Sequence, residues 1–456
     1  RWMRPGDRVV SVREGASATY SYVVHNQHEH PLFDQLATNA YSMSVNDFAA
    51  RRYMNQFVYL PRAIHPKISR ALVIGYGVGN TVAALLADKV LQHVDVVDIS
   101  REALALSREM QTRSARSPLD DPRVQVHIED GRHFLAGGSE AYDLITGEPP
   151  PPIIAGVVNL YTQEYFESVH ARLAPGGMAS YWLPLMNLSV PSTQAIIAGF
   201  CAAFSDCSLW HGSSRNFMLL GTRVAADAKP VSEAHFSAQW NDAALLPELS
   251  AVGFDLPEQI GATFIADAPE LARYTRGMPP LTDDHPKRIS IAGDAAAREA
   301  LIWRLRDTKR ARALFSESPL IARLWPPSLR PATGRQFENQ RLLNDLLFSD
   351  DSPARQTMVL HQVMNATPLR LPVLLLMRSD PDVQQLLSKL SAAELAAPHW
   401  QRDRAAGYLA ARDFASAAQI LQGLPPEALP LKDLSEYVAM LRERAARGGL
   451  PSRAAP

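Results

Sequence analysis

Short apolar runs alternate with helical patterns between residues 70 and 182 of the chain. The apolar runs are rich in β-branched residues, which favours strands. They cover Ala71–Ile74, Val94–Asp98, Val124–Ile128, Tyr142–Thr146 and Met178–Trp182. The helical patterns cover Thr81–Ala87, Arg101–Gln111 and Gln163–Leu173. Because strands that alternate with helices build parallel sheets, this stretch predicts an α/β fold with a doubly wound sheet.

The flanks of this stretch also carry β patterns. Residues 9–30 hold β-branched and aromatic residues around Glu14-Gly15, which predicts a hairpin, and residues 48–60 predict a helix. Leu209–His211 and Phe217–Gly221, separated by GSSRN, predict a closing antiparallel hairpin. We therefore predict a small N-terminal β domain over residues 1–67 and an α/β domain over residues 68–222.

The composition changes after residue 222. Residues 223–290 predict a helical extension that ends in the turn-rich GMPPLTDDHP. There we expect Asp283-Asp284 to form a structural turn, the alternatives being a helix cap or closure over a pocket. Residues 291–456 are rich in Arg, Ala and Leu and predict a helical domain. Ala405–Leu421 has tetratricopeptide-like spacing, but a stable array needs about three such units.

Composition narrows the class of protein. At 456 residues, 46% of them apolar and 20% charged, the chain resembles a soluble globular protein with more than one core. A net charge of −1 gives no reason to expect nucleic acid as a partner. The longest apolar run, Leu371–Met377, is too short to span a membrane. Because the chain starts without methionine, we expect a fragment or a processed form, in which any upstream signal or membrane segment is missing from the sequence.

Cysteine and histidine are not expected to form special sites. The two cysteines, Cys201 and Cys207, imply no disulfide framework and are interpreted as ordinary buried thiols. In HNQHEH, an extended chain places His28 and His30 on one face and His25 on the other. Two ligands on one face are too few alone, so no metal site is predicted.

A glycine-rich loop follows the first predicted strand of the α/β domain. Gly75, Gly77 and Gly79 let the backbone turn tightly and approach a ligand, and a helical pattern follows them. The next strand ends in Asp98, roughly twenty residues later, which is the spacing of a nucleotide-binding βαβ unit. The carboxylate of Asp98 can accept hydrogen bonds from both ribose hydroxyls. The alternatives are a tight turn without ligand and a helix N-cap at Asp98.

Two further acids lie just beyond predicted strands, where ligands bind in sheets of this kind. Asp130-Gly131 follows the third strand, where a carboxylate or backbone amide can hydrogen-bond an adenine edge; a simple Asp-Gly turn is the alternative. Glu148 follows the fourth strand and precedes four prolines, residues 149–152, which make the loop rigid. A solvated loop acid is the alternative for Glu148.

The order of these motifs resembles the spermidine synthase family, the polyamine aminopropyltransferases. The motifs are GYGVGN, DIS, DPRV with EDGRHFL, YDLI, LYTQEYF and LAPGG, and the resemblance covers roughly residues 10–222. The segments EGASAT, AGVVNLYT and LTDDHP are similar to a divergent branch of membrane-fused spermidine synthase-like proteins. That similarity implies a cytoplasmic domain tethered to a membrane by a missing N-terminal segment. The resemblance implies a Rossmann-like S-adenosylmethionine-methyltransferase fold with a small N-terminal β domain.

The resemblance also implies roles for individual residues. It assigns donor binding to Gly75, Gly77, Gly79, Asp98, Asp130 and Gly131. It places Tyr53 at the active-site tyrosine of the family, with a core aromatic as the alternative, and Glu148 at the catalytic aspartate. Trp210 falls near a substrate-pocket tyrosine, but packing in the core is the interpretation that we favour. No metal is implied.

Several family groups that recognise cations are missing. The acid of the family's glycine loop is Val78 here, the second acid of its D-x-x-D-P motif is Pro151, and its N-terminal glutamine is Ser44. The family's Asp-Glu pair in the same N-terminal stretch is Ala49-Ala50. A buried ammonium without a partner costs several kcal/mol. The nucleotide half of the site is therefore expected to be intact and the polyamine half to be changed.

Three hypotheses follow. The first is aminopropyl transfer from decarboxylated S-adenosylmethionine to a small-molecule amine, with Glu148 and Tyr53 orienting the acceptor. The second is methyl transfer from intact S-adenosylmethionine on the same fold. The third is a non-catalytic nucleotide-binding or scaffold protein whose helical C-terminal region binds a protein partner. A homodimer is expected by analogy with the family alone.

Overall fold

The computed structural model describes residues 3, 6–15, 18–27, 30–111, 116–154, 156–213, 215–224, 231–254, 256–284, 295–347, 391–396, 401, 419–420 and 423. The chain divides into two compact units. The first holds Arg1–Ala238 and Pro257–Phe337, and the second holds Gln239–Leu256 and Glu338–Pro456. The predicted tetratricopeptide-like segment lies outside the described residues except for residues 419–420.

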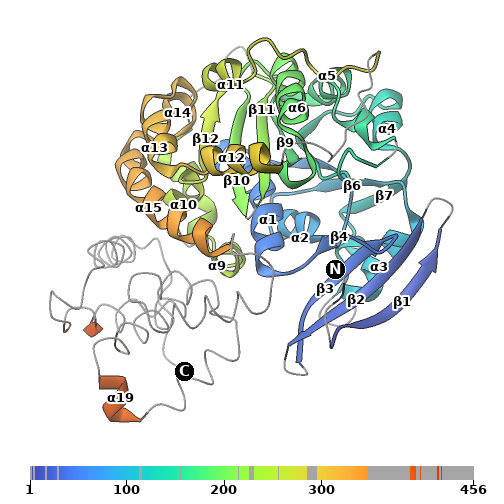
Figure 1. Cartoon of the computed structure of the whole chain (residues 1–456), viewed down its shortest axis with the longest axis horizontal. Coiled ribbons are helices and arrows are strands. Elements are labelled where there is room, and N and C mark those ends of the chain that lie inside the picture. Colours follow the sequence, from blue (N-terminus) through green and yellow to red (C-terminus); the bar gives the residue numbers. More distant parts are fainter. Residues whose placement is uncertain are drawn as a thin grey trace. The chain divides into compact units, whose positions relative to one another are not determined.

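Four antiparallel strands in sequential order form an N-terminal sheet (Figure 1). They are β1 (Arg8–Glu14), β2 (Thr19–Gln27), β3 (His30–Thr38) and β4 (Tyr41–Val45). The predicted hairpin at Glu14-Gly15 is confirmed, with the Gly15 N–H donating to the Ala18 carbonyl over 2.9 Å. Strands β3 and β4 were not predicted. They meet at a turn in which Asn39 and Ala40 adopt positive φ angles of 50° and 60°.

The main sheet has eight strands in the order β12-β10-β11-β9-β8-β5-β6-β7. Their bounds are β5 (Arg70–Ile74), β6 (His93–Asp98), β7 (Val124–Ile128), β8 (Tyr142–Gly147), β9 (Leu173–Pro184), β10 (Ser208–Ser213), β11 (Asn216–Thr222) and β12 (Phe264–Asp267). Strands β5 to β9 are parallel, whereas β10, β11 and β12 pair antiparallel with their neighbours. This order confirms the predicted Rossmann-like methyltransferase fold, and β12 is an additional strand that the pattern did not predict.

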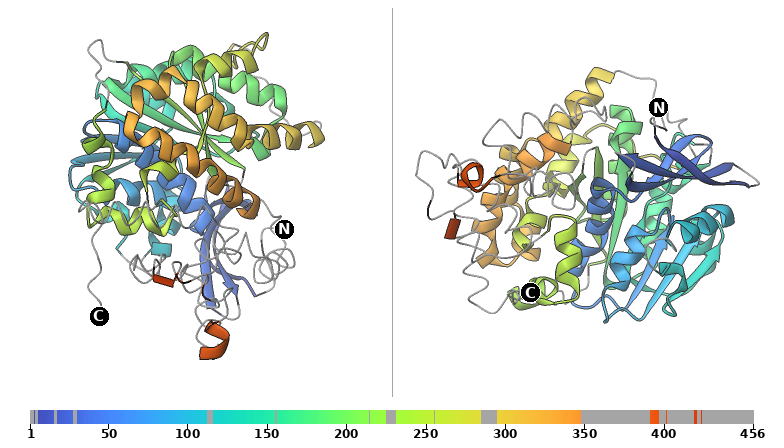
Figure 2. Two further views of the ribbon diagram at one scale, coloured as in Figure 1. Left: turned by 90° about the vertical axis from the view of Figure 1, so that its left-hand side faces the viewer. Right: turned by 90° about the horizontal axis from the view of Figure 1, so that it is seen from below.

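Helices of the first unit pack around this sheet (Figures 1 and 2). The first unit begins with α1 (Phe48–Ile64), α2 (Asn80–Leu86), α3 (Arg101–Gln111), α4 (Gly131–Gly137), α5 (Gln163–Ala171) and α6 (Val190–Ala203), with short 3₁₀ turns η1 (Pro118–Asp120), η2 (Val157–Leu160) and η3 (Leu185–Asn187). The later elements are α7 (Glu233–Phe236), α8 (Ala238–Asn241), α9 (Leu245–Ala251), α10 (Pro257–Gly261), α11 (Ala268–Tyr274), α12 (Ala295–Leu305), α13 (Thr308–Glu317), α14 (Pro319–Leu324), η4 (Pro327–Leu329), α15 (Arg330–Leu347) and α19 (Ala392–Ala396). Helix α1 packs on α2, β9 and β10, and α13 packs on β12.

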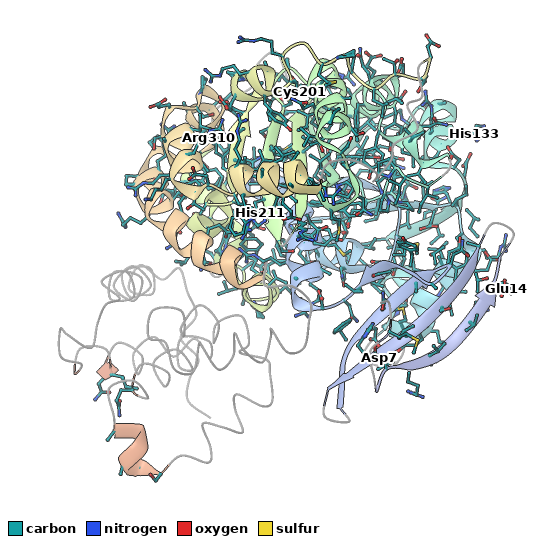
Figure 3. All side chains as sticks on the ribbon, in the orientation of Figure 1. Asp7, Glu14, His133, Cys201, His211 and Arg310 are labelled. Atoms are coloured by element: carbon teal, nitrogen blue, oxygen red, sulfur yellow. A yellow bond between two sulfur atoms is a disulfide. The ribbon has the colours of Figure 1, made fainter. Side chains whose placement is uncertain are left out.

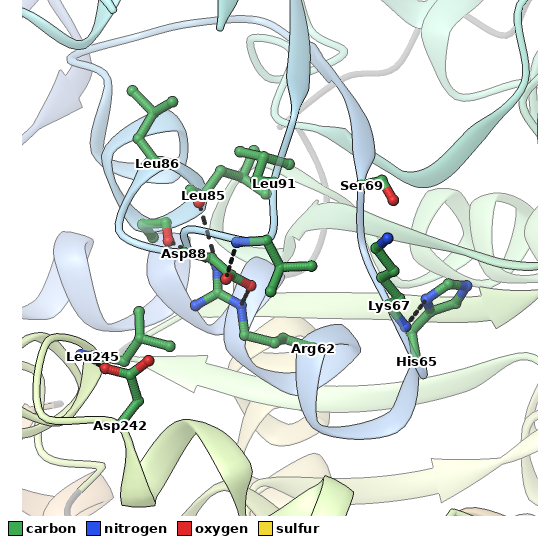
Figure 4. Close-up of polar contacts among 12 residues, drawn as sticks. Arg62, His65, Lys67, Ser69, Leu85, Leu86, Asp88, Leu91, Asp242 and Leu245 are labelled. Carbon is green, nitrogen blue, oxygen red and sulfur yellow. Dashed lines mark hydrogen bonds and ion pairs between the residues drawn. The ribbon is translucent and has the colours of Figure 1, made fainter.

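An ion pair fixes the end of α1 to the end of α2 (Figure 4). The Nε of Arg62 lies 3.1 Å from Oδ2 of Asp88, and its Nη2 donates to the carbonyl of Ala84 over 3.2 Å. A guanidinium is well placed at a helix C-terminus, where carbonyls lack partners within the helix. The contact holds α1, which carries Tyr53, beside α2, which begins at the glycine loop.

The prediction of two free thiols is wrong, because Cys201 and Cys207 form a disulfide. Cys201 lies in α6 (Figure 3), and the helix ends at Ala203. The chain then turns back, with the Cys207 N–H donating to the Phe204 carbonyl over 3.1 Å. This turn places the two Cα atoms 5.2 Å apart, within the usual range for a disulfide.

We expect the double substitution Cys201→Ser and Cys207→Ser to lower the free energy of unfolding by about 2 kcal/mol, because closing a short loop restricts the unfolded chain. Urea unfolding with and without a reductant measures the effect. The reductant should bring the wild type to the stability of the variant and leave the variant unchanged. Equal stabilities without reductant would contradict the expectation.

Candidate active site

The glycine loop connects β5 to α2, and its backbone requires glycine. Gly75, Gly77 and Gly79 have φ angles of +86°, +57° and +83°, in the left-handed region that favours glycine. A Cβ atom on Gly75 would lie 2.8 Å from the carbonyl oxygen of Glu148. The glycine loop therefore lies so close to the backbone at the end of β8 that a side chain at position 75 would clash with it.

Asp98 ends β6 beside this loop. Its Oδ2 accepts a hydrogen bond from the Tyr76 N–H over 3.0 Å, and its Oδ1 accepts one from the Ser100 N–H over 2.9 Å. Burial raises the pKa of the Asp98 carboxyl, while the two backbone hydrogen bonds lower it. The carboxylate thus orders the glycine loop and lies at the carboxyl end of its strand, as predicted.

Ile99 is a site candidate that the sequence analysis missed. Its side chain is 70% exposed although it directly follows Asp98 at the end of a buried strand. In the sequence, the available signal was an apolar residue directly after the acid that ends the strand, a position where a polar residue is more common. Such a side chain offers an apolar surface for a flat ring.

Asp130 and Gly131 follow β7 at the same rim of the sheet. Asp130 caps α4, with its Oδ1 accepting from the backbone N–H groups of Arg132 and His133 over 2.9 and 3.1 Å. Gly131 is buried, and a Cβ atom there would lie 2.6 Å from Cγ2 of Ile74. Because the carboxyl ends of parallel strands meet at one rim, Asp98 and Asp130 lie at the same side of the sheet as the glycine loop.

Glu148 follows β8, and hydrogen bonds hold both its backbone and its carboxyl group. Its N–H donates to the carbonyl of Ile74 over 3.0 Å, and its Oε1 accepts a hydrogen bond from the hydroxyl of Thr81 in α2. Burial raises the pKa of the Glu148 carboxyl to about 7, although the Thr81 hydrogen bond opposes this. A carboxyl with this pKa can take up or release a proton near neutral pH.

Tyr53 reaches the same region from α1. It is 8% exposed, and its ring centroid lies 6.4 Å from that of Trp182 and 5.8 Å from that of Phe57. Burial raises its pKa well above the ordinary tyrosine value, and the neighbouring charge of Glu148 raises it further. The phenol therefore stays neutral, and the structure brings Tyr53 and Glu148 together from different elements.

The position of the missing family acid is occupied by a valine in mainly apolar surroundings. Val78 is buried in an apolar cluster with Tyr22 and Leu36 of the N-terminal sheet and Leu106 of α3. Its N–H donates to Oγ of Ser44 over 3.3 Å. An ammonium group at this position would therefore meet apolar side chains and one hydroxyl.

Trp210 belongs to the core, as the favoured interpretation predicted. It is fully buried, its indole N–H donates to Oγ of Ser208 over 2.9 Å, and its ring packs against Phe264 and Trp325. Among the described residues, no group of three or more His, Cys, Asp or Glu side chains is placed to hold a metal ion. His28 lies outside the described residues.

Comparison with known proteins shows which family this region is similar to. Residues 50–206 match the family model described as spermine/spermidine synthase domain. A polyamine aminopropyltransferase of Lachnoclostridium phytofermentans is 32% identical over 126 residues, which cover 28% of this chain and 44% of that protein. One from Pseudomonas syringae is 25% identical over 180 residues, covering 38% of this chain and 63% of that protein. The match thus spans less than two thirds of the length of these relatives.

The solved structures that are similar include spermidine synthase from Thermotoga maritima, at 16% identity and a TM-score of 0.41. That alignment covers 47% of this chain and 73% of the other. Residues 50–206 of this chain are thus similar to the spermine/spermidine synthase domain and to part of the curated polyamine aminopropyltransferases.

Proposed function

We propose that this domain transfers an aminopropyl group from decarboxylated S-adenosylmethionine to a small-molecule amine. The observation that carries the proposal is the half-buried Glu148, with its pKa raised to about 7, beside the neutral Tyr53 and the glycine loop. The relatives named polyamine aminopropyltransferases support the same reaction class.

The donor would lie along the rim formed by the ends of β5, β6, β7 and β8. Asp98 would accept hydrogen bonds from the ribose hydroxyls, Ile99 would cover one face of the adenine ring, and Asp130-Gly131 would meet the adenine edge. The glycine loop would lie beneath the sulfonium end of the donor. These assignments rest on the shared rim and on the family resemblance.

Glu148 would act on the acceptor. At neutral pH an alkyl ammonium must first lose a proton, at a cost of roughly 4–5 kcal/mol. The amine nitrogen then attacks the carbon next to the sulfonium, the carbon–sulfur electron pair returns to sulfur, and neutral methylthioadenosine leaves. The Glu148 carboxylate would take up the proton that the nitrogen loses as the carbon–nitrogen bond forms. The hydroxyl of Tyr53 would orient the amine.

Methyl transfer from intact S-adenosylmethionine is a second candidate. The observation that favours it is Val78, which stands in an apolar cluster where the family has an acid that selects the decarboxylated donor. The side chains of this cluster carry no charge that would discriminate against a donor carboxylate.

Incubation with each labelled donor and a panel of amines distinguishes the candidates. Mass spectrometry should show a product heavier by one aminopropyl unit, whereas a gain of one methyl unit would establish the second candidate. Calorimetry with both donors and with methylthioadenosine gives an independent measurement. Failure to bind any of the three would support the non-catalytic scaffold.

We expect Asp98→Asn to weaken methylthioadenosine binding by about 1–3 kcal/mol, the scale for losing a charged hydrogen bond. The asparagine oxygen can still accept the hydrogen bond from the Tyr76 N–H, so the glycine loop should persist, whereas the Ser100 N–H loses its acceptor. Calorimetry measures the dissociation constant, and circular dichroism checks the fold. An unchanged dissociation constant would remove Asp98 from the ribose site.

The location of the domain is a separate proposal. A cytoplasmic domain tethered to a membrane was predicted, whereas the Cys201–Cys207 disulfide favours an oxidising compartment. Within the described ranges, no helix is both long enough and apolar enough to cross a membrane.

A further inference from the structure

One arginine at the rim of the sheet joins three separate segments. Arg132 follows Asp130-Gly131 in α4, and its Nη1 donates to the carbonyl of Asn159 in η2 over 3.0 Å. The same nitrogen donates to Oγ1 of Thr162 over 3.3 Å and to Oδ1 of Asp283 over 2.8 Å. Its Nη2 donates to the other carboxylate oxygen of Asp283, so the ion pair is bidentate.

Asp283 is itself held in place, although 151 residues separate it from Arg132. Its N–H donates to Oε2 of Glu164 over 3.1 Å. Two residues earlier, Leu281 is buried and makes two backbone hydrogen bonds. Its carbonyl accepts from the Gln163 N–H over 2.8 Å, and the Leu281 N–H donates to the Ala195 carbonyl over 3.1 Å. The segment of residues 281–284 is thus anchored across the start of α5.

The contact to Asn159 matters because η2 ends the segment that begins at Glu148. Near Glu148, the carbonyl of Pro149 accepts from the Tyr161 hydroxyl over 3.5 Å. At the far end, the carbonyl of Leu160 accepts from the Tyr181 hydroxyl over 2.6 Å. Arg132 therefore connects the adenine side of the rim to the chain that carries the proposed proton acceptor.

The ion pair contributes to position more than to stability. The side chains of Arg132 and Asp283 are 31% and 33% exposed, and ion pairs of this exposure contribute little to the free energy of folding. Arg132 lowers the pKa of the Asp283 carboxyl, which keeps the carboxylate charged over the neutral range. A bidentate carboxylate fixes the plane of the guanidinium, and with it the direction of the hydrogen bond to Asn159.

We propose that Arg132 and Asp283 are positioning residues that fix η2, and through it the segment after Glu148, beside the donor site. The inference rests on the proposed function. Asp283 of the LTDDHP motif would then act both as part of the predicted structural turn and as the residue that holds Arg132 against η2. Neither side chain needs to touch the donor or the acceptor.

Amide hydrogen exchange tests the proposal without requiring turnover. In Asp283→Asn we expect exchange at residues 157–161 to rise about tenfold, because the guanidinium loses its fixed plane. Asp284→Asn is the matched control, an exposed neighbouring acid, and should exchange like the wild type. The melting temperatures of both variants should stay within a few degrees of the wild type. Unchanged exchange at residues 157–161 in Asp283→Asn would overturn the proposal.

Kinetics then separate positioning from a general loss of structure. Asp283→Asn should lower kcat roughly tenfold or more while KM for the donor changes less than threefold, since small displacements of catalytic groups are costly. Arg132→Lys should lower kcat to a similar extent, because an ammonium cannot make the bidentate contact. Wild-type kcat in Asp283→Asn would also overturn the proposal. If the wild type fails to bind methylthioadenosine, the proposed function fails, and the exchange comparison still shows whether the ion pair holds η2.

Discussion

Glu148→Gln should slow turnover by roughly two to three orders of magnitude while leaving donor binding unchanged. Glutamine keeps the shape of the side chain and can accept the Thr81 hydrogen bond, but it cannot take up a proton. General base catalysis contributes about 10²–10⁴-fold in rate, which sets the expected size of the effect. Steady-state kinetics with the acceptor found by the amine panel, and calorimetry with methylthioadenosine, measure the two quantities.

The pH dependence gives a sharper form of this result. Glu148 must be deprotonated to accept the proton, so kcat/KM should rise as the pH increases through about 7. This limb of the profile should disappear in Glu148→Gln. Glu140→Gln is the matched control, an exposed glutamate shortly before β8, and should keep both the rate and the limb. Equal turnover in Glu148→Gln would remove Glu148 from the chemistry.

Asp95→Ala should lower the free energy of unfolding by roughly 2–4 kcal/mol, the second large effect that we expect. The Asp95 side chain is 5% exposed, and its Oδ1 lies 2.8 Å from Nε2 of His127. Its Oδ2 accepts from the Tyr142 hydroxyl over 2.9 Å and lies 3.1 Å from Nε2 of His93. Removing the carboxylate leaves these groups without a shared acceptor. Both histidine rings are partly exposed, so water replaces some of the loss.

The sign of the pH dependence follows from the Asp95 pKa. Burial raises this pKa, but the hydrogen bonds from His127, His93 and Tyr142 outweigh burial, and the pKa is lowered overall. A carboxyl with a lowered pKa stabilises the fold above its unfolded value of about 3.9, and the contribution is lost as the pH falls through the folded value.

Urea unfolding at pH 7 and at pH 3 checks both expectations for Asp95. The difference between wild type and Asp95→Ala should be larger at pH 7 than at pH 3. Asp120→Asn is the control, because Asp120 forms an exposed ion pair with Arg108 at 3.1 Å. Its loss should cost less than about 1 kcal/mol. Equal stability of wild type and Asp95→Ala at pH 7 would contradict the role assigned to this carboxylate.

The rim of the site could be predicted from the sequence because it is built from strand ends. Asp98, Asp130 and Glu148 each come just after an apolar run, and parallel strands bring such positions to one side of the sheet. The parallel sheet could also be predicted, because its strands are apolar runs that alternate with helical patterns. The β3–β4 hairpin and β12 were not predicted, since short strands that mix apolar and polar residues irregularly show little of the alternation that marks a strand.

The contacts between distant segments could not be predicted. No local pattern joins Arg132 to Asp283, and only the folded chain shows that the two side chains meet. The sequence showed that Val78 replaces an acid, but the apolar cluster around it depends on how the N-terminal sheet packs on α3. The disulfide was missed because its formation depends on the turn after α6, and two cysteines alone do not reveal that turn.

Strand β12 has a consequence for how far the α/β unit extends. It pairs with β10 through Ser208, Leu209 and Trp210, and it comes from a segment more than forty residues beyond the end of β11. A polypeptide cut at Thr222 would leave the backbone amides and carbonyls along that side of β10 without partners. Such an unpaired strand is a template for joining another chain. The residues beyond Thr222 therefore complete this side of the sheet by covering β10.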